Sequence, residues 1–272
     1  LALFAFMLKS AIFPLSIWLP DFYKQSPTPI TAIIAGTVTN LGAFGLIRYA
    51  QYLPNDILNR NVIALFAIGT LFYGGILALT QKDIVKMFAY STVSQMGYIF
   101  LGIASQLEPT SSTINLNILN IGLIGAVFYL FAHSIAKSFL FTAVSQYPEN
   151  QTDIDDLKGS GYHIPLPALG FLIGGFTLMG LPPLAGFMGE WMIFAGAFPA
   201  FGTLSTIGVF GIILSNAYFA WLMYRLYIPQ ADVKTRVKSE LTFKIALILN
   251  LIILLIFGLY PGSLISIILG VV

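Results

Sequence analysis

The sequence predicts an all-α polytopic membrane protein with about eight transmembrane helices, two of them discontinuous. Composition is the first observation behind this fold class, because 57% of the 272 residues are hydrophobic and only 9% are charged. The mean hydropathy of +0.87 agrees with it. A typical soluble domain has roughly 25% charged residues, so this chain cannot cover itself with a water-compatible surface. The second observation is a series of long apolar stretches, and the third is proline inside two of them.

Each predicted span rests on an apolar stretch of about 20 residues, the length that crosses a bilayer as a helix. The eight spans cover residues 1–19, 30–50, 61–80, 85–105, 117–146, 164–197, 203–228 and 241–262. The fifth and sixth stretches are longer than a straight span needs, which permits tilt or an internal break. Polar segments separate the spans, among them Pro20-Asp21, Pro54-Asn55-Asp56, Gln81-Lys82-Asp83 and the acidic stretch 149–156.

Basic residues between the spans predict the orientation of the chain. Seven of them follow odd-numbered spans: Lys24, Lys82, Lys86, Lys158, Lys234, Arg236 and Lys238. The other side has only Arg60, with Arg48 near a span end. We therefore expect odd-numbered spans to end in the cytoplasm or an equivalent compartment, and both termini of this chain to lie on the outer side.

The residue types that are missing limit the chemistry of the chain. It contains no Cys, which excludes thiolate-held iron–sulfur clusters and disulfides within this sequence. It has no glycine-rich phosphate loop, and its net charge of +2 is too small to suggest nucleic-acid binding. We therefore expect no cofactor and no metal in this chain. Because the sequence opens on Leu1 at membrane hydropathy and without an initiator Met, we expect a piece of a longer polypeptide.

Proline interrupts two predicted spans, the first at Pro14 and the sixth at Pro182 and Pro183. A proline inside a helix removes a backbone donor and clashes with the preceding turn. Exposed backbone at membrane depth is tolerated only where protein or a wet cavity satisfies it. Two such breaks are typical of the ion site in transporters built from inverted repeats. The alternative is a pair of simple kinks, but Lys9 and Glu190 each lie beside a break, which favours the ion site.

Four ionisable residues lie inside apolar stretches: Lys9, His133, Lys137 and Glu190. A charge at the bilayer centre costs at least about 2.5–3.5 kcal/mol on insertion scales, so such residues indicate an ion or proton path. His133 and Lys137 are four residues apart and share one helix face. Each disfavours a positive charge on the other. Glu190 has no partner nearby in the sequence, and we expect one from another helix, with Lys137 as the candidate.

Structural explanations for these residues stay open. Lys9 could extend its long side chain to the near interface, and His133 could be an isolated buried histidine with Lys137 close to a helix end. Lys137 lies about two turns inside its span, which argues against the second explanation. The acidic residues of the following loop are expected on a solvated face rather than at a metal site: Asp153, Asp155 and Asp156.

Taken in order, these motifs resemble one family, the antiporter-like membrane subunits of respiratory complex I, which also includes Mrp-type sodium/proton antiporters and subunits of energy-converting hydrogenases. The matching stretches are Lys9–Asp21, Ser26–Ala32, Leu41–Arg48, Gln81–Gly97, His133–Lys137 and Gly180–Glu190. The family has about fourteen spans in two inverted repeats, each with a broken helix. The resemblance implies that residues 1–60 end the first repeat. Residues 61–228 would form the second repeat, broken near 180–190, and 229–272 a loop and the last span.

The resemblance also implies roles for single residues. A proton relay would use Lys9 at the first break, His133 and Lys137 at the centre, and Glu190 at the second break. Glutamate at that last position is similar to subunits of the chain M type. The sequence departs from the family where Asn40 and Gln95 replace a usual lysine and a frequent histidine. We expect these amides to form a secondary polar path, in which Asn40 can bind a water wire but cannot carry a charge.

The function that follows is proton translocation by a subunit of a complex I-type NAD(P)H/quinone oxidoreductase in an energy-transducing membrane. NADH, FMN, iron–sulfur clusters and quinone are expected in partner subunits, so this chain would be part of an enzyme without a redox site. Other membrane subunits and the lipid bilayer are the expected partners. The alternatives are an Mrp-type antiporter moving sodium against protons, a hydrogenase membrane subunit and, from another class, a secondary solute transporter.

Overall fold

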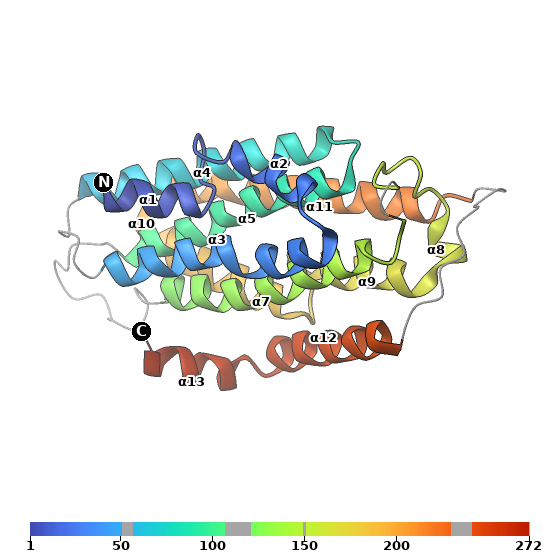
Figure 1. The fold of residues 1–272 in the computed structure, drawn as a ribbon. Helices are drawn as coiled ribbons and strands as arrows, with labels where there is room; N and C mark the ends of the chain where they lie inside the picture. The colour runs from blue at the N-terminus through green and yellow to red at the C-terminus, as the bar shows by residue number, and fades with distance from the viewer. Residues whose placement is uncertain (51–56, 107–120, 149–150, 230–240, 272) are drawn as a thin grey trace.

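The computed structural model describes residues 1–50, 57–106, 121–148, 151–229 and 241–271. Within these ranges the chain forms helices and no β-strand, and the long helices run side by side along one axis (Figure 1). Their bounds are α1 Ala2–Lys9, α2 Trp18–Gln25, α3 Thr28–Ala50, α4 Ile57–Thr80, α5 Ile84–Gln106, α7 Ile121–Val144, α8 Ser160–His163, α9 Pro165–Leu178, α10 Ala185–Phe201, α11 Thr203–Leu226, α12 Leu241–Leu259 and α13 Pro261–Val271.

Five of these helices are long and apolar enough to cross a membrane: α3, α4, α7, α11 and α12. The predicted span 85–105 forms α5, which is as long but less apolar because it contains Lys86, Gln95 and several hydroxyl side chains. Every residue from Ser91 to Ser105 is buried, and α2, α3, α4, α7, α10 and α11 pack around the helix. Because α5 presents little surface to lipid, it can carry polar side chains at membrane depth.

Both predicted helix breaks are confirmed. The first separates α1 from α2, with Pro14 between them, and the second separates α9 from α10, with Pro182 and Pro183 between them. The two broken helices run in opposite directions, since α1 and α10 lie toward one end of the bundle and α2 and α9 toward the other (Figure 1). This is the arrangement expected of inverted repeats.

Side chains of neighbouring helices bind backbone groups that the breaks release. The Phe13 N–H donates to Oγ1 of Thr70 in α4 at 3.0 Å. At the second break, the Leu178 carbonyl accepts a hydrogen bond from Nε2 of Gln95 in α5 at 3.1 Å. Both partners of these backbone groups, one acceptor and one donor, therefore come from inside the protein, as backbone polar groups at membrane depth require.

Glycines allow the central helices to approach closely. A Cβ on Gly97 of α5 would lie 2.6 Å from the Ala67 carbonyl oxygen of α4. A Cβ on Gly125 of α7 would lie 2.5 Å from the Ile193 nitrogen of α10. Small residues are common at contacts between transmembrane helices, because helix association in lipid depends on van der Waals packing rather than on the hydrophobic effect.

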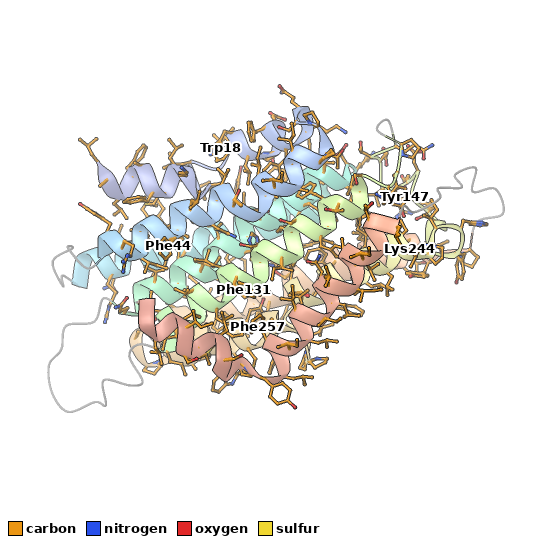
Figure 2. The ribbon with its side chains drawn as sticks, turned by 60° about the horizontal axis from the view of Figure 1, so that its bottom comes forward. Trp18, Phe44, Phe131, Tyr147, Lys244 and Phe257 are labelled. Atoms are coloured by element: carbon orange, nitrogen blue, oxygen red, sulfur yellow. The ribbon has the colours of Figure 1, made fainter. Side chains whose placement is uncertain are left out.

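The last predicted span, 241–262, differs from the structure in its length. The helix α12 ends at Leu259, and a second helix, α13, begins at Pro261, a residue favoured at the first helical position. The labelled rings of Phe257 in α12 and Phe131 in α7 pack edge to face, with centroids 5.1 Å apart (Figure 2). The opposite face of α12 is apolar and exposed at Ile245, Ile248, Leu249, Ile252 and Ile256, as a lipid-facing helix requires.

Ion pairs join the elements at one end of the bundle. The pairs are Lys24–Asp83 at 2.5 Å, Lys86–Asp21 at 3.0 Å, Arg225–Asp155 at 2.5 Å and Lys158–Asp155 at 2.9 Å. The hydrogen bond from Lys158, with the charge of Arg225, holds the pKa of Asp155 below its usual value. Three of the basic residues that predict the orientation, Lys24, Lys86 and Lys158, therefore form ion pairs at this end. Others, Lys234, Arg236 and Lys238, lie outside the described residues, as does the segment 54–56.

Candidate functional site

Three side chains line one face of α7 at a spacing of four residues: Tyr129, His133 and Lys137. This spacing stacks them one above another along the helix. All three are completely buried. Together with Glu190 of α10, which contacts Tyr129, they form what we call the polar row. It occupies the centre of the bundle, between α3, α5 and α10.

Lys137 lies at one end of the polar row and is bound by uncharged groups of α5. Its Nζ donates to the Phe88 carbonyl at 2.8 Å and to the Ser91 hydroxyl. The same Nζ lies 5.8 Å from the centre of the Phe88 ring. No carboxylate of the described residues forms an ion pair with it. A buried ammonium held only by neutral dipoles is costly, so the charge of this lysine is weakly compensated.

His133 is the middle member and is oriented by Asn40 of α3. The Asn40 amide nitrogen lies within hydrogen-bond distance of three oxygens: the Gly36 carbonyl at 3.0 Å, the Leu130 carbonyl at 3.3 Å and the Ser134 hydroxyl at 2.5 Å. This leaves Asn40 Oδ1 facing Nδ1 of His133 at 3.2 Å. We assign the hydrogen to Nδ1 from this network. Nε2 of His133 is buried without a partner among the described residues.

Glu190 closes the polar row at the second break. It is 5% exposed, and its Oε1 lies 3.0 Å from the Tyr129 hydroxyl. That hydroxyl also donates to Oε1 of Gln95. The Gln95 amide nitrogen in turn reaches Leu178, and the hydroxyls of Ser215 and Tyr218, both at 3.3 Å. The carboxyl group therefore belongs to a hydrogen-bonded network that is buried throughout.

The expected partnership of Glu190 with Lys137 is wrong for this structure. Glu190 does receive a partner from another helix, but that partner is Tyr129, two helical turns from Lys137 on α7. Lys137 is bound instead by Phe88 and Ser91. The two ionisable groups therefore occupy opposite ends of the polar row, with His133 and Tyr129 between them.

The second break brings Gly180 against the Glu190 carboxyl group. Gly180 has φ +64°, a left-handed conformation that favours glycine. A Cβ at this position would collide with Glu190 Oε2. On its other side the carboxyl group borders a mostly apolar pocket of about 380 Å³, lined with Gly180 by Trp191, Phe194 and Ile212 among others. Glu190 therefore lies between the polar row and this pocket.

Lys9 is apart from the polar row. It is the last residue of α1, and its side chain is exposed. It makes no hydrogen bond or ion pair with the described residues. The break that follows it does touch α3, since a Cβ on Gly42 would lie 2.8 Å from the Ser10 nitrogen. Of the residues predicted from the sequence, the structure thus brings His133, Lys137, Glu190, Asn40 and Gln95 into one region and leaves Lys9 outside it.

Two contributors were missed by the sequence reasoning, Tyr129 and Ser91. A search for ionisable residues does not select a tyrosine or a serine. The helical spacing could have found Tyr129, because it precedes His133 by four residues, as His133 precedes Lys137. Ser91 gave no such signal, because its contact with Lys137 depends on how α5 and α7 pack.

Comparison with known proteins is consistent with this geometry. Residues 1–215 match the family model described as NADH:quinone oxidoreductase/Mrp antiporter, transmembrane. NADH-quinone oxidoreductase subunit M of Rickettsia prowazekii is 32% identical over 275 residues, covering 97% of this chain and 52% of that protein. F(420)H(2) dehydrogenase subunit M of Methanosarcina mazei is 30% identical over 270 residues, covering 96% of this chain and 51% of that protein.

Among solved structures, respiratory complex I from Thermus thermophilus with bound NADH contains a similar chain. Its TM-score is 0.84 at 25% sequence identity, over 96% of this chain and 54% of the other. The chain spans about half the length of the curated relatives it matches.

Proposed function

The chain belongs to the transmembrane family of NADH:quinone oxidoreductases and Mrp antiporters, and on this basis we propose that it translocates protons as a chain M-like subunit of a complex I-type oxidoreductase. The proposal includes partner membrane subunits and partner-held NADH, FMN, iron–sulfur clusters and quinone. It also includes the predicted orientation, with both termini of this chain on the outer side of an energy-transducing membrane.

The observation that carries the proposal is the polar row itself. Four groups that exchange or relay protons, Lys137, His133, Tyr129 and Glu190, follow one another through the buried centre of the bundle. Intramembrane ionisable residues are expensive and are typical of proton relays in pumps and transporters. A purely structural role does not require Lys137, His133 and Glu190 to lie along one line.

At the lysine end, protonation of Lys137 and of His133 oppose each other. The two side chains are one helical turn apart in a buried site, where like charges repel strongly. Asn40 holds the Nδ1 hydrogen of His133, so its Nε2 is free to accept a proton. A proton that arrives on His133 therefore favours deprotonation of Lys137, and redox-driven changes in neighbouring subunits would bias this balance.

At the glutamate end, the hydrogen-bond network has two states that differ by one proton. The Tyr129 hydroxyl has one hydrogen but faces two acceptors, Gln95 Oε1 and Glu190 Oε1. When Glu190 is protonated, it donates to the Tyr129 oxygen while Tyr129 donates to Gln95, and all three groups are satisfied. When Glu190 loses its proton, Tyr129 can serve only one of them. We propose that Glu190 passes protons outward through this exchange.

Lys9 and Asn40 complete the proposal at the first break. Lys9 would relay protons on the inward side, as the resemblance implies, and its link to the polar row would pass through the contact between the break and α3. Asn40 lies two residues from that contact and binds His133. Because an amide carries no charge, this link would transmit orientation rather than a proton.

An Mrp-type cation/proton antiporter is the second candidate, because the matching family model includes Mrp antiporters. Such a protein would use the same polar row without a redox partner. Isolation from the native membrane discriminates the two: co-purified quinone-reductase subunits support the first, and small antiporter subunits without redox cofactors support the second.

The test of the proposed function is Lys137→Met in the complete complex, reconstituted into proteoliposomes. Methionine has a similar length but no exchangeable proton. We expect electron transfer in the presence of uncoupler to persist and the proton pumping assigned to this subunit to be abolished. Lys244→Met, at the exposed start of α12, is the matched control and should pump normally. Unimpaired pumping by Lys137→Met would overturn the proposal.

A further inference from the structure

We infer that Asp83 is a positioning residue for Lys137, because it joins the first turns of α5, which bind the lysine, to the second half of the first broken helix. This inference rests on the proposed function and adds to it a residue outside the polar row. Asp83 lies directly before α5, at the end of the bundle that carries the ion pairs. Its two carboxylate oxygens bind different groups, one within α5 and one on neighbouring segments.

The oxygen Oδ1 of Asp83 caps the start of α5. It accepts hydrogen bonds from the backbone N–H groups of Val85 at 2.9 Å and of Lys86 at 3.0 Å. The first N–H groups of a helix have no partner within the helix, and an aspartate before the first turn provides one. Its negative charge also interacts favourably with the positive end of the helix dipole. Asp83 therefore fixes the direction in which α5 begins.

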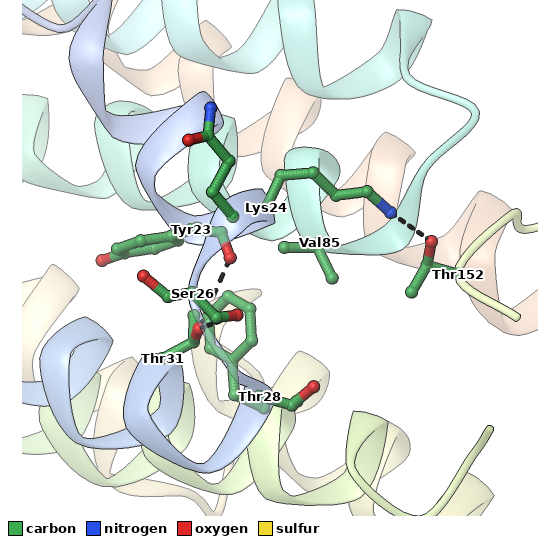
Figure 3. A pocket seen from close by; sticks show the side chains of 9 residues that line it. Tyr23, Lys24, Ser26, Thr28, Thr31, Val85 and Thr152 are labelled. Carbon is green, nitrogen blue, oxygen red and sulfur yellow. Dashed lines mark hydrogen bonds between the residues drawn. The ribbon is translucent and has the colours of Figure 1, made fainter. Parts of the chain in front are cut away.

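The oxygen Oδ2 of Asp83 belongs to a closed set of hydrogen bonds with Lys24 and Thr152. Nζ of Lys24 donates to Oδ2 and to Oγ1 of Thr152, both at 2.5 Å, and Thr152 donates to the same Oδ2 at 2.7 Å. Figure 3 shows Lys24 of α2 reaching across to Thr152, which lies in the loop after α7. Exposed ion pairs usually contribute little to stability, but the Asp83 side chain is only 22% exposed and has several partners. We call Lys24, Asp83 and Thr152 the clasp.

The loop after α7 is also paired with the start of α5 through its backbone. The Ile84 N–H donates to the Thr152 carbonyl at 2.8 Å, and the Ile154 N–H donates to the Lys82 carbonyl at 2.7 Å. These two bonds flank Asp83 and form an antiparallel bridge. The clasp therefore lies between two segments that are already held together, and Lys24 adds α2 to them.

Two ion pairs of opposite polarity join α2 to the start of α5. Lys24 of α2 binds Asp83, and Asp21 of α2 accepts a hydrogen bond from Nζ of Lys86 at 3.0 Å. The two charges on each segment are three residues apart, so they lie on the same side of that segment. A shift of α2 by one turn would bring like charges together, which is unfavourable. The charges therefore allow one register of α2 on α5.

The first two turns of α5 supply both groups that bind Lys137. Phe88 and Ser91 follow Asp83 by five and eight residues, which is ~7.5 and ~12 Å along an α-helix. No described carboxylate pairs with Lys137, so its ammonium group depends on the Phe88 carbonyl and the Ser91 hydroxyl. A tilt or shift at the start of α5 would move both groups away from Nζ together. The clasp therefore keeps the ligands of Lys137 in place and links them to the position of α2.

The first arm of the test is Lys24→Met in the reconstituted complex, which removes the ion pair and leaves the Asp83 cap intact. We expect much of the proton pumping assigned to this subunit to be lost, with assembly and uncoupled electron transfer retained. Lys24→Arg keeps the charge and should restore pumping. Lys82→Met is the matched control and should pump normally, because Lys82 is exposed and forms no ion pair among the described residues. Asp83→Asn provides the same test independently, since asparagine also caps helices but cannot form the ion pair.

The second arm is a double-mutant cycle with Ser91→Ala, which tests whether the clasp acts through the ligands of Lys137. Lys24 and Ser91 lie on different helices and share no hydrogen-bond partner, and substitutions at such independent sites normally have independent effects. If the clasp positions Ser91, Lys24→Met should lower pumping by a much smaller factor in the Ser91→Ala background than in the unmodified complex. Equal factors in the two backgrounds would contradict the inference.

The outcomes separate this inference from the proposed function. If Lys137→Met stops pumping while Lys24→Met and Asp83→Asn pump normally, the positioning role is overturned and the proposed function stands. If Lys137→Met pumps normally, the proposed function fails and the inference fails with it. A loss in Lys82→Met equal to that in Lys24→Met would also overturn the positioning role, since any change of charge at this end of the bundle would then be sufficient.

Discussion

The residues of the polar row differ in the hydrogen-bond partners that surround them. Lys137 is held by a carbonyl and a hydroxyl and by no described carboxylate, so its charge is weakly compensated. His133 has one ring nitrogen fixed by Asn40 and the other without a partner. Glu190 shares the hydrogen of Tyr129 with Gln95. Each group is therefore placed so that gaining or losing a proton changes its hydrogen bonding, which is the property that a relay needs.

The substitution Glu190→Gln tests the glutamate end of the polar row. Glutamine has the same shape and can bind Tyr129, but it cannot exchange a proton. We expect assembly and uncoupled electron transfer to be retained, with the protons pumped per electron falling as far as in Lys137→Met. The readout is the proton-to-electron ratio in proteoliposomes. A wild-type ratio in Glu190→Gln would show that protons leave the row by another group.

The sequence predicted these residues unevenly, and the reason is physical. His133, Lys137 and Glu190 are ionisable groups in apolar stretches, so the cost of burying a charge identifies them without a fold. Tyr129 and Ser91 carry no such cost, and their roles depend on which helices meet. The pairing of Glu190 with Lys137 was wrong because a sequence gives the position of a group along its helix and not the rotation of one helix against another.

The broken helices α1/α2 and α9/α10 position the groups at the two breaks. In both broken helices, a residue with positive φ, Ala11 or Gly180, precedes the proline of the break. A side chain of a neighbouring helix then binds the released backbone, Thr70 at Phe13 and Gln95 at Leu178. Gln95 thus connects the second break with Tyr129, so that the geometry of the break and the hydrogen bonding of Glu190 depend on each other.

Gly180→Ala tests the conformation of the second break. The added Cβ would collide with the Glu190 carboxyl group and would place an alanine at positive φ, which costs of order 1–3 kcal/mol. We expect a lower temperature of thermal inactivation of the complex. Gly262→Ala in α13, where a Cβ meets nothing within 4 Å, should be neutral or slightly stabilising because alanine favours a helix. Equal stability of the two variants would contradict the tight contact.

Helix positions were mostly predictable and their ends were not. Hydropathy indicated α3, α4, α7, α11 and α12, and proline indicated both breaks. The second helix after Pro261 was not predicted, because an apolar stretch does not reveal where a helix bends. The helix α5 was predicted as an ordinary span, but its burial among six helices explains a polarity that a lipid-facing helix could not bear.

The whole molecule is asymmetric along its axis. One end holds the ion pairs of Lys24, Lys86, Lys158 and Arg225. The opposite end holds the turn between α10 and α11 (Figure 1). From the positive-inside rule, we propose that the first end lies on the cytoplasmic side.

This orientation is testable with single cysteines, because the chain has none of its own. Asp156→Cys lies at the ion-paired end and Thr203→Cys at the other, and both positions are exposed. With a membrane-impermeant maleimide, we expect Thr203→Cys to react in right-side-out vesicles and Asp156→Cys only in inverted ones. The reverse pattern would contradict the predicted orientation.

The central claim is that one proton path joins Lys137 to Glu190 along α7. Infrared difference spectroscopy of the complex during turnover tests it most directly, with the Glu190 carboxyl signal identified by its loss in Glu190→Gln. We expect that signal to change in the unmodified complex and in Lys244→Met, and to be silent in Lys137→Met, because Glu190 would receive no proton. A Glu190 signal that changes equally in Lys137→Met would contradict the account.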